Sequence, residues 1–238
     1  MDRRLFRPAF AVLATLALVS GCGWLGGTEE EKLPGERVSI MVGVEDLIQA
    51  DSSISELEVV LPPAERNANW AQAGGNEPHA LQHLALGAQP SRAWRADVGN
   101  GNSSDAQLLA QPVIVDGVVY TMDSRSTVSA FDASSGKRRW RVDLEPEDED
   151  DGYFGGGIAR ADGRLYVTTG FAQVFALNAS DGSVIWQTPV PAPMRAAPTV
   201  AAGRVYVVTL DNQVRALDAE TGKNLWDQSG IEEIAGLI

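Results

Sequence analysis

A motif that recurs three times in the second half of the chain is the strongest constraint on how it can fold. Each copy has a turn glycine, a tyrosine three residues later, then an alanine, a second glycine and a tryptophan. The markers shift by 46 positions and then by 40, without a gap inside a copy. The positions are Gly117, Tyr120, Ala130, Gly136 and Trp140; Gly163, Tyr166, Ala176, Gly182 and Trp186; and Gly203, Tyr206, Ala216, Gly222 and Trp226. Repeats of this length are typical of propellers and solenoids.

Each copy is expected to form four short strands. In the second copy, Asp162-Gly163 fits a two-residue hairpin turn, and a second Asp-Gly pair precedes the last strand. Strands this close along the chain pair antiparallel. The middle strands, near 164–169 and 173–178, are apolar on both faces, so each sheet needs a neighbour on either side. We therefore predict an all-β fold, a propeller of four-stranded antiparallel blades, with repeats at about 111–145, 157–190 and 197–230.

The recurring tyrosine, alanine and tryptophan are interpreted as packing groups between blades, with each small alanine admitting a large neighbour. Three copies do not close a ring, because propellers have roughly four to eight blades. The segment around Trp94 resembles the fourth strand of a blade, since Arg92–Asp97 matches Arg138–Asp143. We therefore expect the chain to be the N-terminal portion of a longer polypeptide, in which Trp94 belongs to a blade completed by later residues.

The N-terminal residues have the order of a secretory signal. Three arginines within the first seven residues precede an apolar run over 9–19, which is shorter than the roughly 20 residues that span a bilayer. The run ends in Val-Ser-Gly directly before Cys22, the single cysteine, and this resembles a bacterial lipobox. The prediction is a lipoprotein signal peptide over 1–21, a lipid-anchored linker and N-terminal segment over 22–69, and a partial propeller over 70–238.

Lipidation at Cys22 is directly testable. Several acyl chains on one thiol and its new amino terminus would give stable anchoring, since a single chain binds only weakly. Mass spectrometry of the mature protein should show an N-terminal, acylated Cys22. An unmodified N-terminus at any other residue would contradict the lipoprotein interpretation.

Charge and composition exclude several classes of function. The 238 residues carry a net charge of −13, which repels phosphate, so no nucleic-acid partner is expected. One cysteine and two histidines leave no intrachain disulfide and no histidine-rich metal site. His79 and His83 have helical spacing but lack a third ligand, and the acidic run 145–151 lacks the spacing of a calcium loop. We expect no metal, no cofactor and no catalytic residues.

Beyond the fold, the sequence resembles a known family. The pattern Ala-[Phe/Leu]-[Asp/Asn]-Ala-x-x-Gly-x-x-x-Trp is similar to the repeat of quinoprotein-like propellers. Together with the lipobox, the segment Leu33–Arg37 and the motif Asn-Trp-x-Gln-x-Gly-Gly-Asn over 69–76, it resembles the BamB family. This resemblance implies an eight-bladed propeller without enzymatic activity. It further implies a lipid anchor on the periplasmic face of the outer membrane and binding to the POTRA domains of the central subunit of the β-barrel assembly machinery.

The resemblance also points to a partner-binding loop. The connections between blades should emerge on the same face as the turns between second and third strands. In one of them, Met194 and Arg195 match the apolar-x-apolar-Arg segment that the family uses against the barrel subunit. Arg195 could instead pair with a nearby acid. Two other functions stay open: a lipid-anchored propeller for another envelope ligand, or a quinoprotein dehydrogenase, although such enzymes usually carry a vicinal cysteine pair.

Overall fold

The computed structural model describes residues 51, 53, 57–147 and 155–230. The chain divides into two units at Val59, and every element below lies in the second unit, Val60–Ile238. The expected signal peptide and the lipidation site at Cys22 lie outside the described residues.

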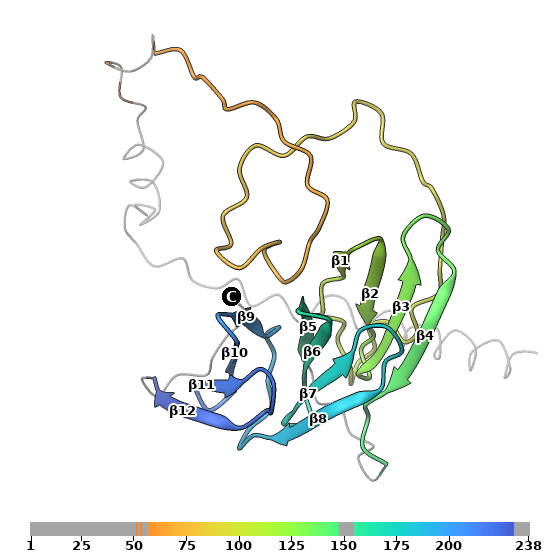
Figure 1. Cartoon of the computed structure of the whole chain (residues 1–238), viewed down its shortest axis with the longest axis vertical. Helices are drawn as coiled ribbons and strands as arrows, with labels where there is room; N and C mark the ends of the chain where they lie inside the picture. Colours follow the sequence, from red (N-terminus) through yellow and green to blue (C-terminus); the bar gives the residue numbers. More distant parts are fainter. Residues whose placement is uncertain (1–50, 52, 54–56, 148–154, 231–238) are drawn as a thin grey trace, which may run out of the picture. The chain divides into compact units, whose positions relative to one another are not determined.

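In the described part of the chain, twelve strands form three separate four-stranded sheets, each an antiparallel meander in chain order (Figure 1). The prediction of an all-β fold with four-stranded antiparallel blades is confirmed, and the three described blades leave the ring open. The strands are β1 (Val113–Val115), β2 (Val118–Met122), β3 (Thr127–Asp132) and β4 (Arg138–Asp143) in blade 1; β5 (Gly156–Ala161), β6 (Arg164–Thr169), β7 (Gln173–Asn178) and β8 (Val184–Pro189) in blade 2; and β9 (Thr199–Ala201), β10 (Arg204–Val208), β11 (Gln213–Asp218) and β12 (Asn224–Ser229) in blade 3.

Two-residue turns join the first two strands of every blade. In blade 2, Asp162 has a φ of 43° and Gly163 a φ of 79°, and the equivalent pairs in the other blades are also left-handed. Two successive positive φ values match the right-handed twist of a hairpin, and glycine takes the second position without steric cost. The Asp-Gly turn predicted from the sequence is therefore confirmed.

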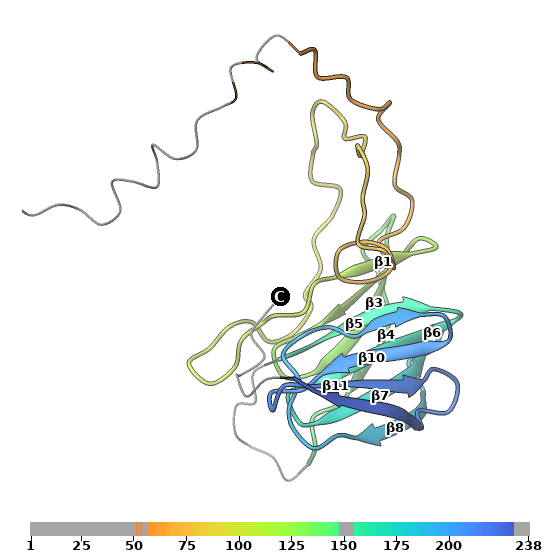
Figure 2. The same ribbon diagram turned by 90° about the vertical axis from the view of Figure 1, so that its left-hand side faces the viewer.

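The blades stack through two apolar clusters. One joins Tyr120 and Val128 of blade 1 to Ile158 and Leu165 of blade 2, and the other joins blade 2 to blade 3. Blade 2 is thus buried on both faces, as its apolar middle strands predict. The first strands lie nearest one another, with β5 in contact with both β1 and β9, while the fourth strands lie on the outside of the fan (Figures 1 and 2).

Two of the recurring tryptophans, Trp140 and Trp186, dock on the next blade. The Nε1 of Trp140 donates a hydrogen bond to the carbonyl of Ala179 at 3.0 Å, and the hydroxyl of Tyr120 reaches the same oxygen at 3.3 Å. A Cβ at Gly182 would stand 2.7 Å from the Trp140 ring, so only glycine fits below it. Trp186 repeats the arrangement on Ala219 and Gly222 of blade 3. The tyrosine, alanine and tryptophan positions are therefore packing groups.

The two ends of the stack differ from the interior. Trp94 donates to the carbonyl of Ala133 at 2.8 Å and covers Gly136, so it occupies on blade 1 the place that Trp140 occupies on blade 2. Within the described residues the segment around Trp94 forms no strand, and its place in a blade completed by later residues stays a prediction. At the other end Trp226 is 44% exposed, because no described residue lies over it. Within the described residues, the interpretation of the repeat tryptophans as packing groups between blades therefore does not hold for Trp226.

The motif over 69–76 crosses the first strands of all three blades. Trp70 exchanges two backbone hydrogen bonds with Ile114, and the carbonyl of Ala71 accepts from the Arg160 amide at 2.7 Å. The side chain of Gln72 accepts from the Val200 amide at 2.9 Å. Ile114, Arg160 and Val200 are equivalent positions of the repeat. This short segment thus forms hydrogen bonds with the first strand of each described blade. Without it, the backbone groups on that edge of the sheet would be unpaired.

Candidate functional site

The loops that form the candidate site emerge at one end of the blades. In blade 1, Met122 pairs with Val128 and Thr127 pairs with Asp143, so the β2–β3 turn lies beside the end of β4. The other blades have the same register. The connections between blades, such as 190–198, therefore share a face with the turns over 123–126, 170–172 and 209–212, as the sequence analysis expects, and we call it the loop face.

The inter-blade loop over 190–198 is held by hydrogen bonds from both neighbouring blades. The Leu210 amide donates to the carbonyl of Pro193 at 2.8 Å. The Thr168 hydroxyl donates to the carbonyl of Ala196 at 2.7 Å, and the Met194 amide donates to the carbonyl of Thr169 at 3.3 Å. The loop is therefore fixed in place by its backbone as well as by its three prolines.

Met194 does not lie on the surface. Its side chain is fully buried in the apolar cluster between blades 2 and 3, with Val190 and Val207. A Cβ added at Gly155 would stand 2.3 Å from the Met194 carbonyl oxygen, so the preceding connection also passes close to it. The expectation that this loop presents the Met194 side chain to a partner is wrong, because an unbranched apolar side chain gains more from filling the gap between the blades.

Arg195 has a different environment from its neighbour. It is partly exposed, and its Nε is buried without a hydrogen-bond partner among the described residues. Within this part of the chain it forms no ion pair with a carboxylate, so the alternative of a structural pairing finds no support here. A buried guanidinium nitrogen without an acceptor is costly, and a partner that supplied an acceptor would relieve the cost.

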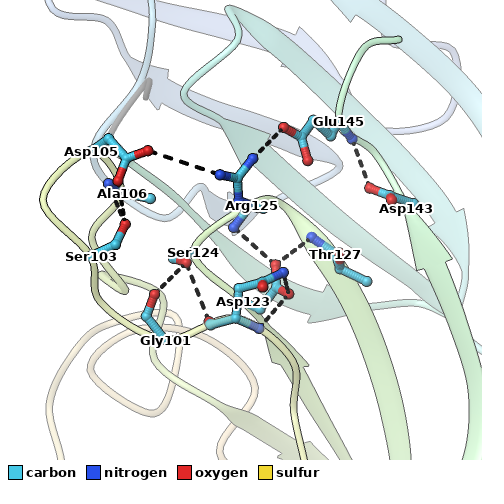
Figure 3. Close-up of polar contacts among 11 residues, drawn as sticks. Gly101, Ser103, Asp105, Ala106, Asp123, Ser124, Arg125, Thr127, Asp143 and Glu145 are labelled. Atoms are coloured by element: carbon cyan, nitrogen blue, oxygen red, sulfur yellow. Dashed lines mark hydrogen bonds and ion pairs between the residues drawn. The ribbon is translucent and has the colours of Figure 1, made fainter. Parts of the chain in front are cut away.

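A second arginine stands on the turn of blade 1. Arg125 lies between two carboxylates, with Nη1 at 3.2 Å from Glu145 and Nη2 at 3.9 Å from Asp105 (Figure 3). A hydrogen bond from the Ser103 hydroxyl is the main reason that the pKa of Asp105 is lowered from its usual value. These exposed ion pairs contribute little to stability, but they orient the Arg125 side chain across the loop face.

Asp123 holds the loop over 97–106 against the same turn (Figure 3). Its carboxylate accepts from the amides of Arg125 and Thr127 through Oδ1, at 2.9 and 2.8 Å. Through Oδ2 it accepts from the backbone and side-chain nitrogens of Asn100, at 2.9 and 3.1 Å. A Cβ at Gly99 would collide with this carboxylate. The buried Asp123 carboxylate thus holds both the β2–β3 turn and the loop over 97–106 on the blade 1 part of the loop face.

The sequence analysis missed Asp123 and Arg125, although the repeat contains a signal for the first. Asp123 stands where the other two blades have Thr169 and Thr209. A carboxylate at a position that elsewhere holds a hydroxyl indicates additional hydrogen-bond donors, and the loop over 97–106 supplies them. The difference between Asp123 and the two threonines, which is visible in the aligned copies, would have identified this hydrogen-bonded loop.

The described residues contain neither a candidate metal site nor a candidate membrane-spanning helix. Among them no group of three or more His, Cys, Asp or Glu side chains is arranged to hold a metal ion. No helix in the described ranges has the length and apolar character needed to cross a bilayer.

Comparison with known proteins identifies one family. The family model described as "Outer membrane protein assembly factor BamB" matches residues 85–150 and 124–238, which together make up more than half of the chain. No match was found among curated proteins.

Solved structures supply the fold comparison. Quinohemoprotein alcohol dehydrogenase from Comamonas testosteroni is 24% identical with a TM-score of 0.57, over 69% of this chain and 28% of that one. BamB from Moraxella catarrhalis is 22% identical with a TM-score of 0.43, over 54% and 38%. Quinohemoprotein alcohol dehydrogenase ADHIIG from Pseudomonas putida HK5 is 29% identical with a TM-score of 0.45, over 53% and 21%. The first of these supports the propeller fold, and the matches span less than two-fifths of each solved chain.

Proposed function

Because the chain belongs to the family of the outer membrane protein assembly factor BamB, we propose that it is a non-enzymatic scaffold lipoprotein of the β-barrel assembly machinery. In this proposal Cys22 carries the lipid anchor and holds the propeller on the periplasmic face of the outer membrane. The loop face binds the POTRA domains of the central barrel subunit and so assists insertion of outer-membrane proteins.

The observation that supports the partner site best is the state of Arg195. It lies on a loop whose backbone is fixed by both adjacent blades, and its Nε has no acceptor among the described residues. A pre-ordered loop loses little conformational entropy on binding. Arginine is also enriched among the residues that dominate the energy of protein interfaces. Met194 contributes indirectly, because its buried side chain fixes the backbone that carries Arg195.

The proposal that the chain lacks catalytic activity rests on its residues. Quinoprotein dehydrogenases, whose repeat this sequence resembles, usually carry a vicinal cysteine pair, whereas the chain has one cysteine. In the proposed role the blades act as a rigid support for loops and contribute no reacting group.

Arg195→Glu in the full-length protein should reduce co-purification of the barrel subunit. Loss of a central interface arginine costs roughly 2 kcal/mol or more, which corresponds to about a thirtyfold loss of affinity. The matched control is Arg204→Glu, which makes the same charge change at an exposed position beside the β9–β10 turn, at the other end of the blades. Circular dichroism and thermal unfolding of both variants report whether folding is retained.

Equal co-purification with Arg195→Glu and Arg204→Glu would show that this loop does not contact the barrel subunit. If the unmodified protein recovers a different envelope component and no barrel subunit, the alternative of a lipid-anchored propeller for another ligand would replace the proposal.

A further inference from the structure

A cavity lies between blades 1 and 2, at the end of the blades away from the loop face. Its volume is about 470 Å³, and it lies beside the Asp116-Gly117 and Asp162-Gly163 turns. Tyr120 and Val118 of blade 1 line it on one side, and the residues over 178–180 of blade 2 line it on the other. This volume is within the range of small-molecule sites, about 300–1,000 Å³. We call it the Arg160 cleft.

Arg160 is the residue that distinguishes this blade boundary. The equivalent positions in the other blades hold Ile114 and Val200, which are both aliphatic. Along β5 the side chains alternate: Ile158 packs in the cluster with blade 1, whereas Ala159 packs in the cluster with blade 3. Arg160 therefore points toward blade 1, on the same side as Ile158. A guanidinium group lies where the repeat otherwise places an apolar side chain.

The guanidinium of Arg160 is not neutralised by the described part of the chain. Its Nε is buried without a hydrogen-bond partner, and no described carboxylate forms an ion pair with it. An unpaired buried donor costs free energy, and a charged donor costs more. The residue as a whole is partly exposed, so an acceptor for this donor can reach it from outside.

The other polar groups of the cleft define the charge of that acceptor. Arg139 lines the cleft but already forms an ion pair with Asp132 at 2.8 Å. Asp116 contributes one carboxylate, whose negative charge repels any anionic ligand. The Asn178 side-chain oxygen accepts from the amide and hydroxyl of Ser180, so its amide nitrogen is the group left to donate. With Arg139 already paired, Arg160 and Asp116 leave the lining without net charge, so a monoanion meets less repulsion from Asp116 than a dianion does.

We propose that the Arg160 cleft is a binding site for a carboxylate monoanion, held by the Arg160 guanidinium with support from the Asn178 amide. A planar carboxylate accepts two parallel hydrogen bonds from a guanidinium, which fits this donor better than a phosphate dianion next to Asp116. The site is independent of the proposed POTRA contact, because it lies at the opposite end of the blades. The carboxylate could come from a free small acid or from a peptide, and the test separates these two sources.

The test is a titration of the full chain followed by NMR, with the Trp140 indole N–H as reporter. That group bonds to the carbonyl of Ala179, and Ala179 lines the cleft. Acetate serves as the free acid and acetyl-Ala-Ala as the peptide carboxylate. Acetyl-Ala-Ala-amide is the neutral control, and inorganic phosphate, titrated at a pH above its second pKa, is the dianion. We expect saturable shifts with one or both carboxylates, and roughly tenfold weaker binding of phosphate and of the amide.

Arg160→Ile installs the residue that blade 1 carries at the equivalent position, so folding should be retained. Its affinity for the carboxylate should fall about tenfold or more. Arg138→Ile removes the same charge from an exposed position on β4 and should bind normally. Binding that persists in Arg160→Ile, an equal response to the amide, or no saturable shift with any carboxylate would each overturn the proposal. If Arg160→Ile does not fold, Arg160→Gln provides the same test with the polar side chain kept.

Discussion

Trp186→Ala should lower the free energy of unfolding of this chain by about 3 kcal/mol, the lower end of the usual range for removing a packed tryptophan. The indole covers Gly222 of blade 3 and donates to the Ala219 carbonyl at 3.1 Å. Removing it leaves a gap at the boundary between two blades and one carbonyl without this donor. Because the indole is only partly buried, the larger losses seen in closed cores are not expected. Urea unfolding followed by circular dichroism measures the change.

Trp226→Ala is the matched control for this prediction. Trp226 lies at the same position of β12 and has the same contact with its own tyrosine, with ring centres 6.0 Å apart in both blades. It is 44% exposed and has no blade above it among the described residues. Its loss should cost about 1 kcal/mol or less, as is usual for surface positions. Equal losses for Trp186→Ala and Trp226→Ala would show that docking on the next blade contributes nothing.

The blades could be predicted from the sequence because every local signal agreed. Asp162-Gly163 predicts a tight hairpin, and the strands on either side are apolar on both faces, so a stack of small sheets follows from turn chemistry and burial alone. The exposure of Trp226 was not predictable in the same way. Burial of a docking group depends on what lies beyond it, and the repeat pattern does not specify the neighbour of each tryptophan.

The candidate site was less predictable than the fold. Met194 and Arg195 are adjacent, and no local pattern distinguishes their environments, yet one is fully buried and the other is partly exposed. The segment over 69–76 was identified as a motif, but its contacts with three blades depend on tertiary pairing that no local pattern specifies.

The exceptions within the repeat, Asp123 and Arg160, were visible in the alignment of the copies. Their roles could be inferred only from the residues that the fold places beside them.

Asp123→Ala should also destabilise the chain by about 3 kcal/mol, and it should act through the loop face. The carboxylate is 2% exposed and accepts hydrogen bonds from the amides of Arg125, Thr127 and Asn100. Alanine leaves these donors without this acceptor. The hydrogen bond from Thr127 is buried and those from Arg125 and Asn100 are partly buried, and each unsatisfied buried donor costs roughly 1–3 kcal/mol. Thermal or urea unfolding against the unmodified chain measures the total.

Asp123→Thr separates the two tasks of this carboxylate. In blades 2 and 3 the equivalent threonines, Thr169 and Thr209, bond through their hydroxyls to the backbone of the residue that begins the third strand. Threonine at 123 should therefore restore the β2–β3 turn and recover part of the stability, because its hydroxyl can reach Thr127. It is too short to hold Asn100 as well, so the loop over 97–106 should detach while the blade stays folded. Amide hydrogen exchange should then become faster at Asn100 and Ser124 and stay unchanged at Val128, and protection of Asn100 in Asp123→Thr would show that the loop is held by other contacts.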